Sequence, residues 1–276
     1  MLYEKYLVVA SKKDRAGINI TTQLSQFREN PLVSSMKKTP SFDFYLVDEE
    51  IIETKNLDLN RINQYDFIIF ASKHQSEKSQ KALTIHSPGN FRDARYGGEK
   101  GKICKTSAIF LKQAFEKMIK NAEKYHLKDY DITMEATHHG PLIDKPCMFI
   151  EIGSTENEWR DSKAGFIVAK AISEAIEEYK PNPYNEVAIA IGGSHYCPNF
   201  NKIQSNSNIA ISHVISQYVF PLTEEMIKEA IDKTDEEVDF VLLDWKGLGN
   251  EDSRKIIKEI LDKLYLNSKK TSDISK

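Results

Sequence analysis

Continuous apolar runs of about strand length alternate along this chain with longer segments in which apolar residues recur at helical spacing. Such runs are typical of strands that are covered on both faces. Strands are predicted at residues 6–11, 42–47, 66–71, 83–90, 130–136, 147–152, 187–191 and 238–243. Helices are predicted at residues 18–27, 107–122, 162–179, 220–233 and 250–264. This alternation predicts an α/β fold with a mostly parallel or mixed central sheet flanked by helices.

The chain has 276 residues, of which 40% are hydrophobic and 29% charged, enough apolar material for a sizeable core. We expect one catalytic domain over residues 1–266 and a polar, frayed tail over residues 267–276, because no repeat or low-complexity linker divides the chain. Neither a signal peptide nor a membrane span is predicted. The three cysteines are widely spaced and include no CxxC pair, so neither a disulfide framework nor a thiolate zinc site is expected. A reducing cytoplasm is therefore the expected location.

Histidines concentrate where predicted strands end. In open α/β sheets, ligands bind beyond the carboxyl ends of the strands. Five of the seven histidines and one carboxylate follow or end such strands. We therefore expect six side chains to share one rim: His74, His86, His138, His139, His195 and Glu151. The remaining histidines, His126 and His213, are expected elsewhere.

Imidazoles and a carboxylate that converge on one cleft suit two kinds of chemistry. A catalytic zinc site uses nitrogen and oxygen ligands and keeps one position open for water. Metal-free general acid–base catalysis by histidine, positioned by Glu151, is the alternative. No HExxH motif or similar local spacing is present, so the residues alone leave both alternatives open.

The adjacent pair His138 and His139 stands just before a Gly-Pro break. Successive residues of a strand point to opposite faces, so only one of the pair is expected to enter the site unless the strand has already ended. We expect His138 and Glu151 to face the reaction, and His139 to support them as a partner or an acid.

Glycines and cations supply further candidate binding residues. Gly192 and Gly193 follow the strand at 187–191, where backbone amides are able to cradle a phosphate or an ester carbonyl. Residues 92–105 are glycine-rich and basic, and we expect an exposed, mobile loop there. A net charge of −3 does not exclude a nucleic-acid partner, since a local basic patch is sufficient.

Six sequence blocks, in order along the chain, resemble the archaeal and plant-type D-aminoacyl-tRNA deacylase family. They are SKHQS (72–76), LTIHSPGN (83–90), ATHHGP (136–141), EIGSTENEW (151–159), GGSHYCPNF (192–200) and DWKG (244–247). Family members often carry a glycine at position 194 and a cation at position 199, where this chain has Ser194 and Asn199. Around His213 the chain also lacks cations that the family often has, which affects tRNA contacts more than the reaction type.

The resemblance implies a zinc-containing hydrolase that cleaves the ester between a D-amino acid and tRNA and releases both. It also implies a fold similar to those of phosphorylases and peptidyl-tRNA hydrolases. The expected partner is tRNA carrying a D-amino acid, and the protein is expected to be a monomer or a small homo-oligomer.

The resemblance and the strand ends together assign roles to particular residues. The expected catalytic residues are His138, His139 and Glu151. The expected Zn²⁺ ligands are His74, His86, His138, His195 and Glu151. The residues expected to bind the ester or the tRNA are Gly192, Gly193, Ser154, Arg92, Arg95, Lys100, Lys102 and Lys105, with Lys12, Lys13 and Arg15 at further phosphates.

Two other classes of protein are alternatives. One is a nucleoside phosphorylase-like or peptidyl-tRNA hydrolase-like enzyme of the same fold, which would need a phosphate site or a different ester. The other is a binding module that holds tRNA ends without chemistry. The concentration of titratable groups at one expected rim favours an enzyme.

Overall fold

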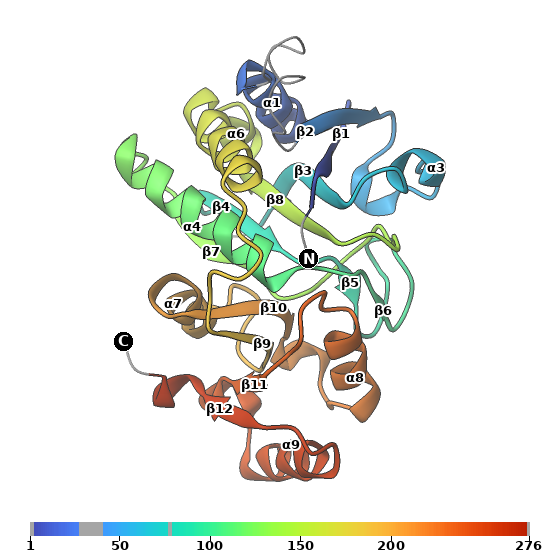
Figure 1. The fold of residues 1–276 in the computed structure, drawn as a ribbon, viewed down its shortest axis with the longest axis vertical. Helices are drawn as coiled ribbons and strands as arrows, with labels where there is room; N and C mark the ends of the chain where they lie inside the picture. The colour runs from blue at the N-terminus through green and yellow to red at the C-terminus, as the bar shows by residue number, and fades with distance from the viewer. Residues whose placement is uncertain (1–2, 28–40, 77–78, 275–276) are drawn as a thin grey trace.

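The computed structural model describes residues 3–27, 41–76 and 79–274. Its larger sheet has six strands in the order β2-β1-β3-β8-β4-β7 (Figure 1). Their bounds are β1 Lys5–Ser11, β2 Ser41–Val47, β3 Phe67–Gln75, β4 Ala82–His86, β7 Asp131–Met134 and β8 Cys147–Ser154. Strands β2, β1, β3 and β8 are parallel, whereas β4 pairs antiparallel with β8 and parallel with β7. The predicted α/β class with a mixed central sheet is therefore confirmed.

Both faces of this sheet are covered, which explains the continuous apolar runs. Val8 and Ile69 face a core that includes helices α1 (Arg15–Leu24), α4 (Ala108–Lys124) and α6 (Ser162–Glu177). Leu7 and Ile68, one position earlier in each strand, face a separate core with Ile51 of the short helix η2 (Ile51–Glu53). That second core also lies against the short helix α3 (Leu59–Ile62). Successive residues thus bury opposite faces, as strand geometry requires.

A buried aspartate ties the first helix to the end of β3. The Asp14 carboxylate caps α1 by accepting hydrogen bonds from the amides of Ala16 at 2.9 Å and Gly17 at 3.1 Å. It also accepts from the amide of Lys73 at 2.7 Å. The residue that follows Lys73 is His74, so this cap fixes the backbone from which His74 enters the site.

A second sheet was not expected from the sequence. It has four parallel strands in the order β10-β9-β11-β12. Their bounds are β9 Glu186–Ile191, β10 Ile209–Ile215, β11 Phe240–Leu243 and β12 Ser268–Lys270. The helices of this half are α7 (Pro198–Asn206), α8 (Glu224–Asp232) and α9 (Glu251–Lys263). Side chains of α8 and α9 pack with β9, β10 and β11 in one apolar core.

Strand β10 was not predicted from the sequence because two polar residues interrupt its apolar run. Ser212 and His213 are both buried, and each has a polar partner. The hydroxyl oxygens of Ser212 and Thr234 are 2.7 Å apart. His213 Nδ1 lies 3.2 Å from Thr137 Oγ1, in the segment that leaves the larger sheet. Paired in this way, both polar groups are compatible with a buried strand.

Parts of two segments that were expected to be flexible form short strands. Within the expected frayed tail, Ser268–Lys270 forms a strand that pairs with β11. Without this strand, the main-chain hydrogen-bonding groups on that edge of β11 would be unpaired. Within the expected mobile loop, β6 (Lys102–Ile103) pairs antiparallel with β5 (Gly89–Asn90). In the described ranges, no helix is both long and apolar enough to cross a membrane.

Candidate active site

The segment from Glu135 to Gly140 lies between the two sheets and is fixed by main-chain hydrogen bonds. The amide of Ala136 donates to the carbonyl of His195 at 2.8 Å, and that of Thr137 donates to Val214 at 3.0 Å. The amide of Gly89 donates to the carbonyl of His139 at 2.7 Å. Side chains on this segment therefore start from a backbone held by three separate parts of the chain, as a preorganised site requires.

Two buried carboxylates lie in the middle of the histidine cluster. Glu135 Oε1 is 3.3 Å from His74 Nδ1 and 3.1 Å from His195 Nε2. Glu151 Oε2 accepts a hydrogen bond from Thr84 Oγ1 at 3.1 Å and lies 3.6 Å from His74 Nδ1. His74 therefore stands between the two carboxylates, and its Nε2 is 3.1 Å from the hydroxyl of Tyr196.

Three further imidazoles form a second group. The ring centroid of His138 is 4.2 Å from that of His86 and 4.2 Å from that of His139. In all three rings Nδ1 faces a backbone carbonyl, at 2.8 Å for His138, 2.8 Å for His139 and 3.2 Å for His86. A carbonyl only accepts, so Nδ1 carries the proton and each Nε2 keeps a lone pair. This arrangement is the usual one for histidines that ligate a metal.

Burial and mutual repulsion keep these three imidazoles neutral. Burial lowers the pKa of His86 to about 3 and the pKa of His139 to about 4. Burial also holds the pKa of His138 well below its ordinary value, and His86 and His139 add to this effect. Neutral imidazole is the form that binds a metal ion.

The carboxylates and His74 titrate together. Burial lowers the pKa of His74, but hydrogen bonding and attraction to Glu135 and Glu151 outweigh it and raise that pKa to about 11. Burial raises the pKa of Glu135, but His195 and His74 hold it well below its ordinary value. Burial raises the pKa of Glu151 to about 7. One carboxylate is thus ionised at neutral pH, and the other is poised to exchange a proton.

Several buried polar atoms of the cluster suit a metal ion. His86 Nε2 and both carboxylate oxygens of Glu135 are buried without a hydrogen-bond partner of acceptable geometry. Leaving such atoms unpaired costs about 1–3 kcal/mol each. Three overlapping sets bring their donor atoms within 4.8 Å of one another: His86 with His138 and His139, Glu135 with His138 and His195, and His74 with Glu135 and Glu151. Nitrogen and oxygen donors of this kind are those that zinc takes.

The structure brings both adjacent histidines into the cluster, which is the case expected if the strand ends before the pair. Strand β7 ends at Met134, and alternation does not extend to positions 138 and 139. His139 also takes a φ of +44°, a left-handed backbone conformation in which strand alternation does not apply.

The expected common rim of parallel strand ends is wrong for β4 and β7. His86 stands at the carboxyl end of β4, yet it pairs with Phe149 in the middle of β8, because β4 runs antiparallel to β8. Thr84, two residues earlier, pairs with Glu151. The groups meet across an antiparallel pair of strands, beneath the segment that leads to the second sheet.

Glu135 is the central residue that the sequence did not reveal. Its position in the run 130–136 placed it opposite Ile132, Met134 and Ala136, on the face expected to be polar. That face is covered in the structure by the loop that carries His195. The one available signal was a carboxylate at the end of a predicted strand, three residues before the histidine pair.

Two cavities meet at the histidines. The larger, of about 690 Å³, includes Glu50, Lys73, His74, Glu151 and Tyr196 in its lining. The smaller, of about 440 Å³, includes Arg92, Arg95 and Tyr218. Both are lined by His138, His139, His195 and Tyr96.

The expected oxyanion amides are engaged within the protein. The amide of Gly192 donates to Ile215 at 2.8 Å and that of Gly193 to Gly247 at 3.1 Å. Their φ angles of +104° and +75° let the chain turn there. The amides of Gly192 and Gly193 are therefore not free to face an oxyanion. Ser154 donates its hydroxyl to the carbonyl of Gln80 and lines neither cavity, and a role for its amide stays a prediction.

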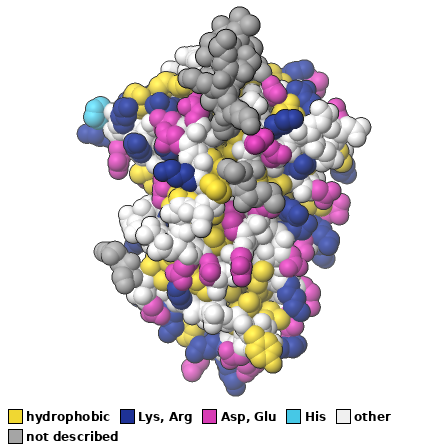
Figure 2. Space-filling view, viewed as in Figure 1, with side chains coloured by type: hydrophobic (Ala, Val, Ile, Leu, Met, Phe, Trp, Pro, Cys, Tyr) yellow, Lys and Arg dark blue, Asp and Glu magenta, His cyan; other side chains and the backbone are white. Residues whose placement is uncertain are grey.

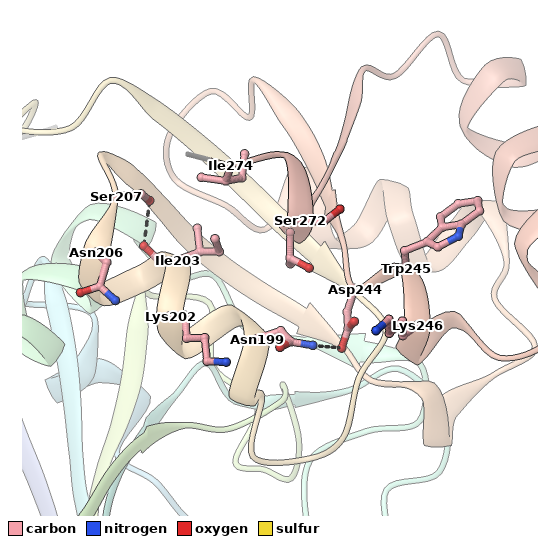
Figure 3. A pocket seen from close by; sticks show the side chains of 11 residues that line it. Asn199, Lys202, Ile203, Asn206, Ser207, Asp244, Trp245, Lys246, Ser272 and Ile274 are labelled. Atoms are coloured by element: carbon pink, nitrogen blue, oxygen red, sulfur yellow. Dashed lines mark hydrogen bonds between the residues drawn. The ribbon is translucent and has the colours of Figure 1, made fainter. Parts of the chain in front are cut away.

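A separate cavity of about 570 Å³ lies between α7, the segment that begins at Asp244 and residues near Ser272 (Figure 3). Asn199 Nδ2 donates to Asp244 Oδ2 at 3.0 Å across it, and Lys202 and Lys246 line it as well. A Cβ on Gly193 would lie 3.0 Å from the same oxygen of Asp244. The segment 244–247 thus supports the loop that carries His195 and does not itself enter the cluster.

The predicted cations divide into two groups. Arg92 and Arg95 line the smaller cavity, and Arg92 also donates to the carbonyls of Val219 and Pro221. The others are exposed and line neither cavity: Lys100, Lys102, Lys105, Lys12, Lys13 and Arg15. On the face seen in Figure 2, acidic and basic side chains are interspersed, without an extended area of one sign. His126 is exposed, and His213 lies in β10 outside the three donor sets.

The fold and the site define an α/β enzyme with a buried histidine–carboxylate centre between two sheets. The sequence profile described as D-aminoacyl-tRNA deacylase matches residues 61–268. The chain belongs to the D-aminoacyl-tRNA deacylase family.

Relatives in that family match nearly the whole chain. A D-aminoacyl-tRNA deacylase of Thermococcus onnurineus is 35% identical and covers 94% of this chain and 97% of its own length. The deacylase of Archaeoglobus fulgidus is 33% identical, with 98% of each chain covered. A crystal structure of a conserved protein of unknown function superposes with a TM-score of 0.85 at 28% identity, covering 98% of this chain and 96% of that one.

Proposed function

We propose that the protein hydrolyses the ester bond of D-aminoacyl-tRNA and releases the D-amino acid and tRNA. The observation that carries the proposal is the buried centre at the meeting of the two cavities, where His138, His139 and His195 line both. A scissile ester at that junction would lie between an amino acid on one side and a nucleotide on the other. Membership of the family and the names of the relatives support the same reaction.

Zinc is part of the proposal, and the donor set fits it. His86, His138 and His139 would hold it through Nε2, with Glu135 as a carboxylate ligand and His195 at the exposed side. Bound there, zinc would act as a Lewis acid and lower the pKa of a coordinated water towards about 7. This assignment replaces His74 and Glu151 by Glu135 and His139 among the expected ligands.

In this proposal Glu151 accepts a proton, and His74 stabilises negative charge. Glu151 has a pKa raised to about 7 by burial, so it is suited to accept a proton from the attacking water. Thr84 Oγ1 holds one of its oxygens at 3.1 Å, which fixes the direction of the carboxylate. His74, beside Glu135 and Glu151, supplies positive charge near the oxygen that becomes negative.

Separate incubation with D-tyrosyl-tRNA and L-tyrosyl-tRNA tests the reaction. The proposal expects release of D-tyrosine at a rate well above both the uncatalysed rate and the release of L-tyrosine. A nucleoside and inorganic phosphate, incubated in parallel, test the phosphorylase alternative. Phosphorolysis without release of D-tyrosine would overturn the proposal. If neither reaction occurs, the protein would instead be a module that binds tRNA ends without chemistry. A cytoplasmic location, where tRNA is charged, belongs to the same proposal.

A further inference from the structure

The smaller cavity has a composition that differs from that of the larger one. Among the described residues, three tyrosines are more than half exposed: Tyr96 at 63%, Tyr218 at 54% and Tyr265 at 94%. Tyr96 and Tyr218 both line this cavity beside the histidines, and Tyr218 lines it without lining the larger one. Large aromatic side chains left in water at a cavity are a recurrent feature of ligand sites.

The backbone beneath both tyrosines is fixed, although their rings are open to solvent. The carbonyl of Tyr96 accepts from the amide of Gly140 at 2.9 Å, directly after the histidine pair. Tyr218 lies in η3 (Gln217–Val219), where the amide of Gln217 donates to Gly193 at 3.1 Å. Arg92 clamps the same turn through the carbonyl of Val219. The rings thus stand on a rigid support, so a ligand would order few groups on binding.

Charge distinguishes the two cavities. Arg92 and the exposed Arg95 line the smaller one, together with Asp93, which lies 3.9 Å from Lys100. The larger cavity contains the carboxylates Glu50 and Glu151, and Glu50 is paired with Lys73 at 3.0 Å. A phosphate-bearing group therefore suits the smaller cavity at Arg95, whereas the cation of the larger cavity, Lys73, is already paired with Glu50.

We infer that the smaller cavity binds the terminal nucleotide of the tRNA, with the base stacked on the exposed tyrosines and the phosphate at Arg95. Bases stack on aromatic rings without sequence preference, because every base has a π-face. The volume of about 440 Å³ lies in the range of small-molecule sites. The ring of Tyr218 is 6.0 Å from that of His195, so a ribose beside the stacked base reaches the cluster.

This inference rests on the proposed function, and it specifies the orientation in which the substrate binds. The nucleotide enters from the side of Tyr218 and Arg95, while the D-amino acid extends into the cavity of Glu50 and Lys73. Nucleotide and amino acid thus occupy different cavities that share the histidines.

Binding of adenosine 5′-monophosphate, measured by calorimetry, tests the nucleotide site without any need for activity. Tyr218→Ala is expected to weaken this binding about 5- to 150-fold, the range given by loss of one base–aromatic stack. Tyr218→Phe keeps the ring and is expected to bind as wild type. Tyr265→Ala removes an equally large exposed ring outside the cavity and is the matched control. Arg95→Gln is expected to weaken the monophosphate more than adenosine.

Kinetics with D-tyrosyl-tRNA provide the second readout. Tyr218→Ala is expected to raise KM while kcat stays near wild type, because a contact present in both ground and transition states is lost. D-Tyrosine is expected to bind together with adenosine 5′-monophosphate. Competition between the two would overturn the assignment, as would equal binding of the monophosphate by wild type, Tyr218→Ala and Tyr96→Ala. If wild type binds the monophosphate through Tyr218 but releases no D-tyrosine, the proposed function fails and the nucleotide site stands.

Discussion

The carboxylate oxygen Oε1 of Glu135 lies 3.1 Å from Nε2 of His195, and this pair joins the two sheets at the active site. Glu135 directly follows β7 of the larger sheet, and His195 follows β9 of the smaller one. The next residue after Glu135, Ala136, donates its amide to the carbonyl of His195 at 2.8 Å. The centre is therefore complete only when both sheets are folded and packed together.

Glu135→Gln should abolish metal binding and reduce deacylation at least about 100-fold. The substitution keeps the side-chain shape but removes the negative charge that His74 and His195 share. Elemental analysis of the purified variant and its rate on D-tyrosyl-tRNA are the measurements. Glu123→Gln, an exposed glutamate of α4, is the control and should behave as wild type. Full metal content and activity in Glu135→Gln would show that this carboxylate is structural only.

Removal of zinc should lower both activity and thermal stability. A ligand that binds only the folded protein stabilises it according to its concentration and affinity, so chelation is expected to lower Tm. The physical reason is that His86 Nε2 and the carboxylate oxygens of Glu135 are buried without a hydrogen bond of acceptable geometry. Restoring zinc should recover both properties. Full activity in protein verified as metal-free would mean that the cluster works by acid–base chemistry alone.

Gly193→Ala should reduce turnover although the residue lies outside the cluster. Its φ of +75° costs an alanine about 1–2 kcal/mol, and the added Cβ would lie 3.0 Å from Asp244 Oδ2. The displaced turn carries His195. Gly101→Ala is the matched control, because φ is +68° there and no atom lies within 4 Å of an added Cβ. An equal loss of kcat in both variants would contradict the proposal that packing of the Gly193 turn against Asp244 positions His195.

Lys112→Met should destabilise the protein by about 1–3 kcal/mol. The fully buried ammonium group donates to the carbonyls of Gln204 and Ser207, at the end of α7, and thereby joins α4 to the second half of the chain. Burial lowers its pKa below the ordinary 10.5, so wild type should gain stability relative to the variant as pH rises towards that value. Denaturant unfolding at neutral and alkaline pH measures both effects, and the exposed Lys120→Met should change stability by less than about 0.5 kcal/mol.

Much of the fold was predictable because strands covered on both faces leave continuous apolar runs, as β3 and β8 do. The helices predicted at 107–122 and 250–264 begin at the caps Ser107 and Asn250, whose side chains accept hydrogen bonds from amides of the first turn. Division of the strands between two sheets was not predictable, because a buried run does not reveal its neighbours. Strand β12 in particular is polar and owes its structure to the open edge of β11.

The site was predictable as a set of histidines but not as a geometry. His74, His86, His138, His195 and Glu151 were expected together, and they do converge. His139 was expected there as well, but the place of Glu135 in the centre depends on where β7 ends and on how the second sheet packs, which the residue pattern does not show. From the sequence, the amides of Gly192 and Gly193 were expected to bind a ligand. Only the fold reveals that both amides already donate hydrogen bonds within the protein.

The rate of D-tyrosyl-tRNA hydrolysis by Glu151→Gln tests the account most directly. The buried carboxylate of Glu151, held by Thr84 at 3.1 Å, is the proposed proton acceptor. Glu156→Gln, five residues further along and exposed, is the matched control. With both variants folded as judged by circular dichroism and Tm, we predict a loss of at least about 100-fold for Glu151→Gln and none for Glu156→Gln. Turnover near wild type in Glu151→Gln, with metal present, would contradict the assignment of this cluster as the hydrolytic centre.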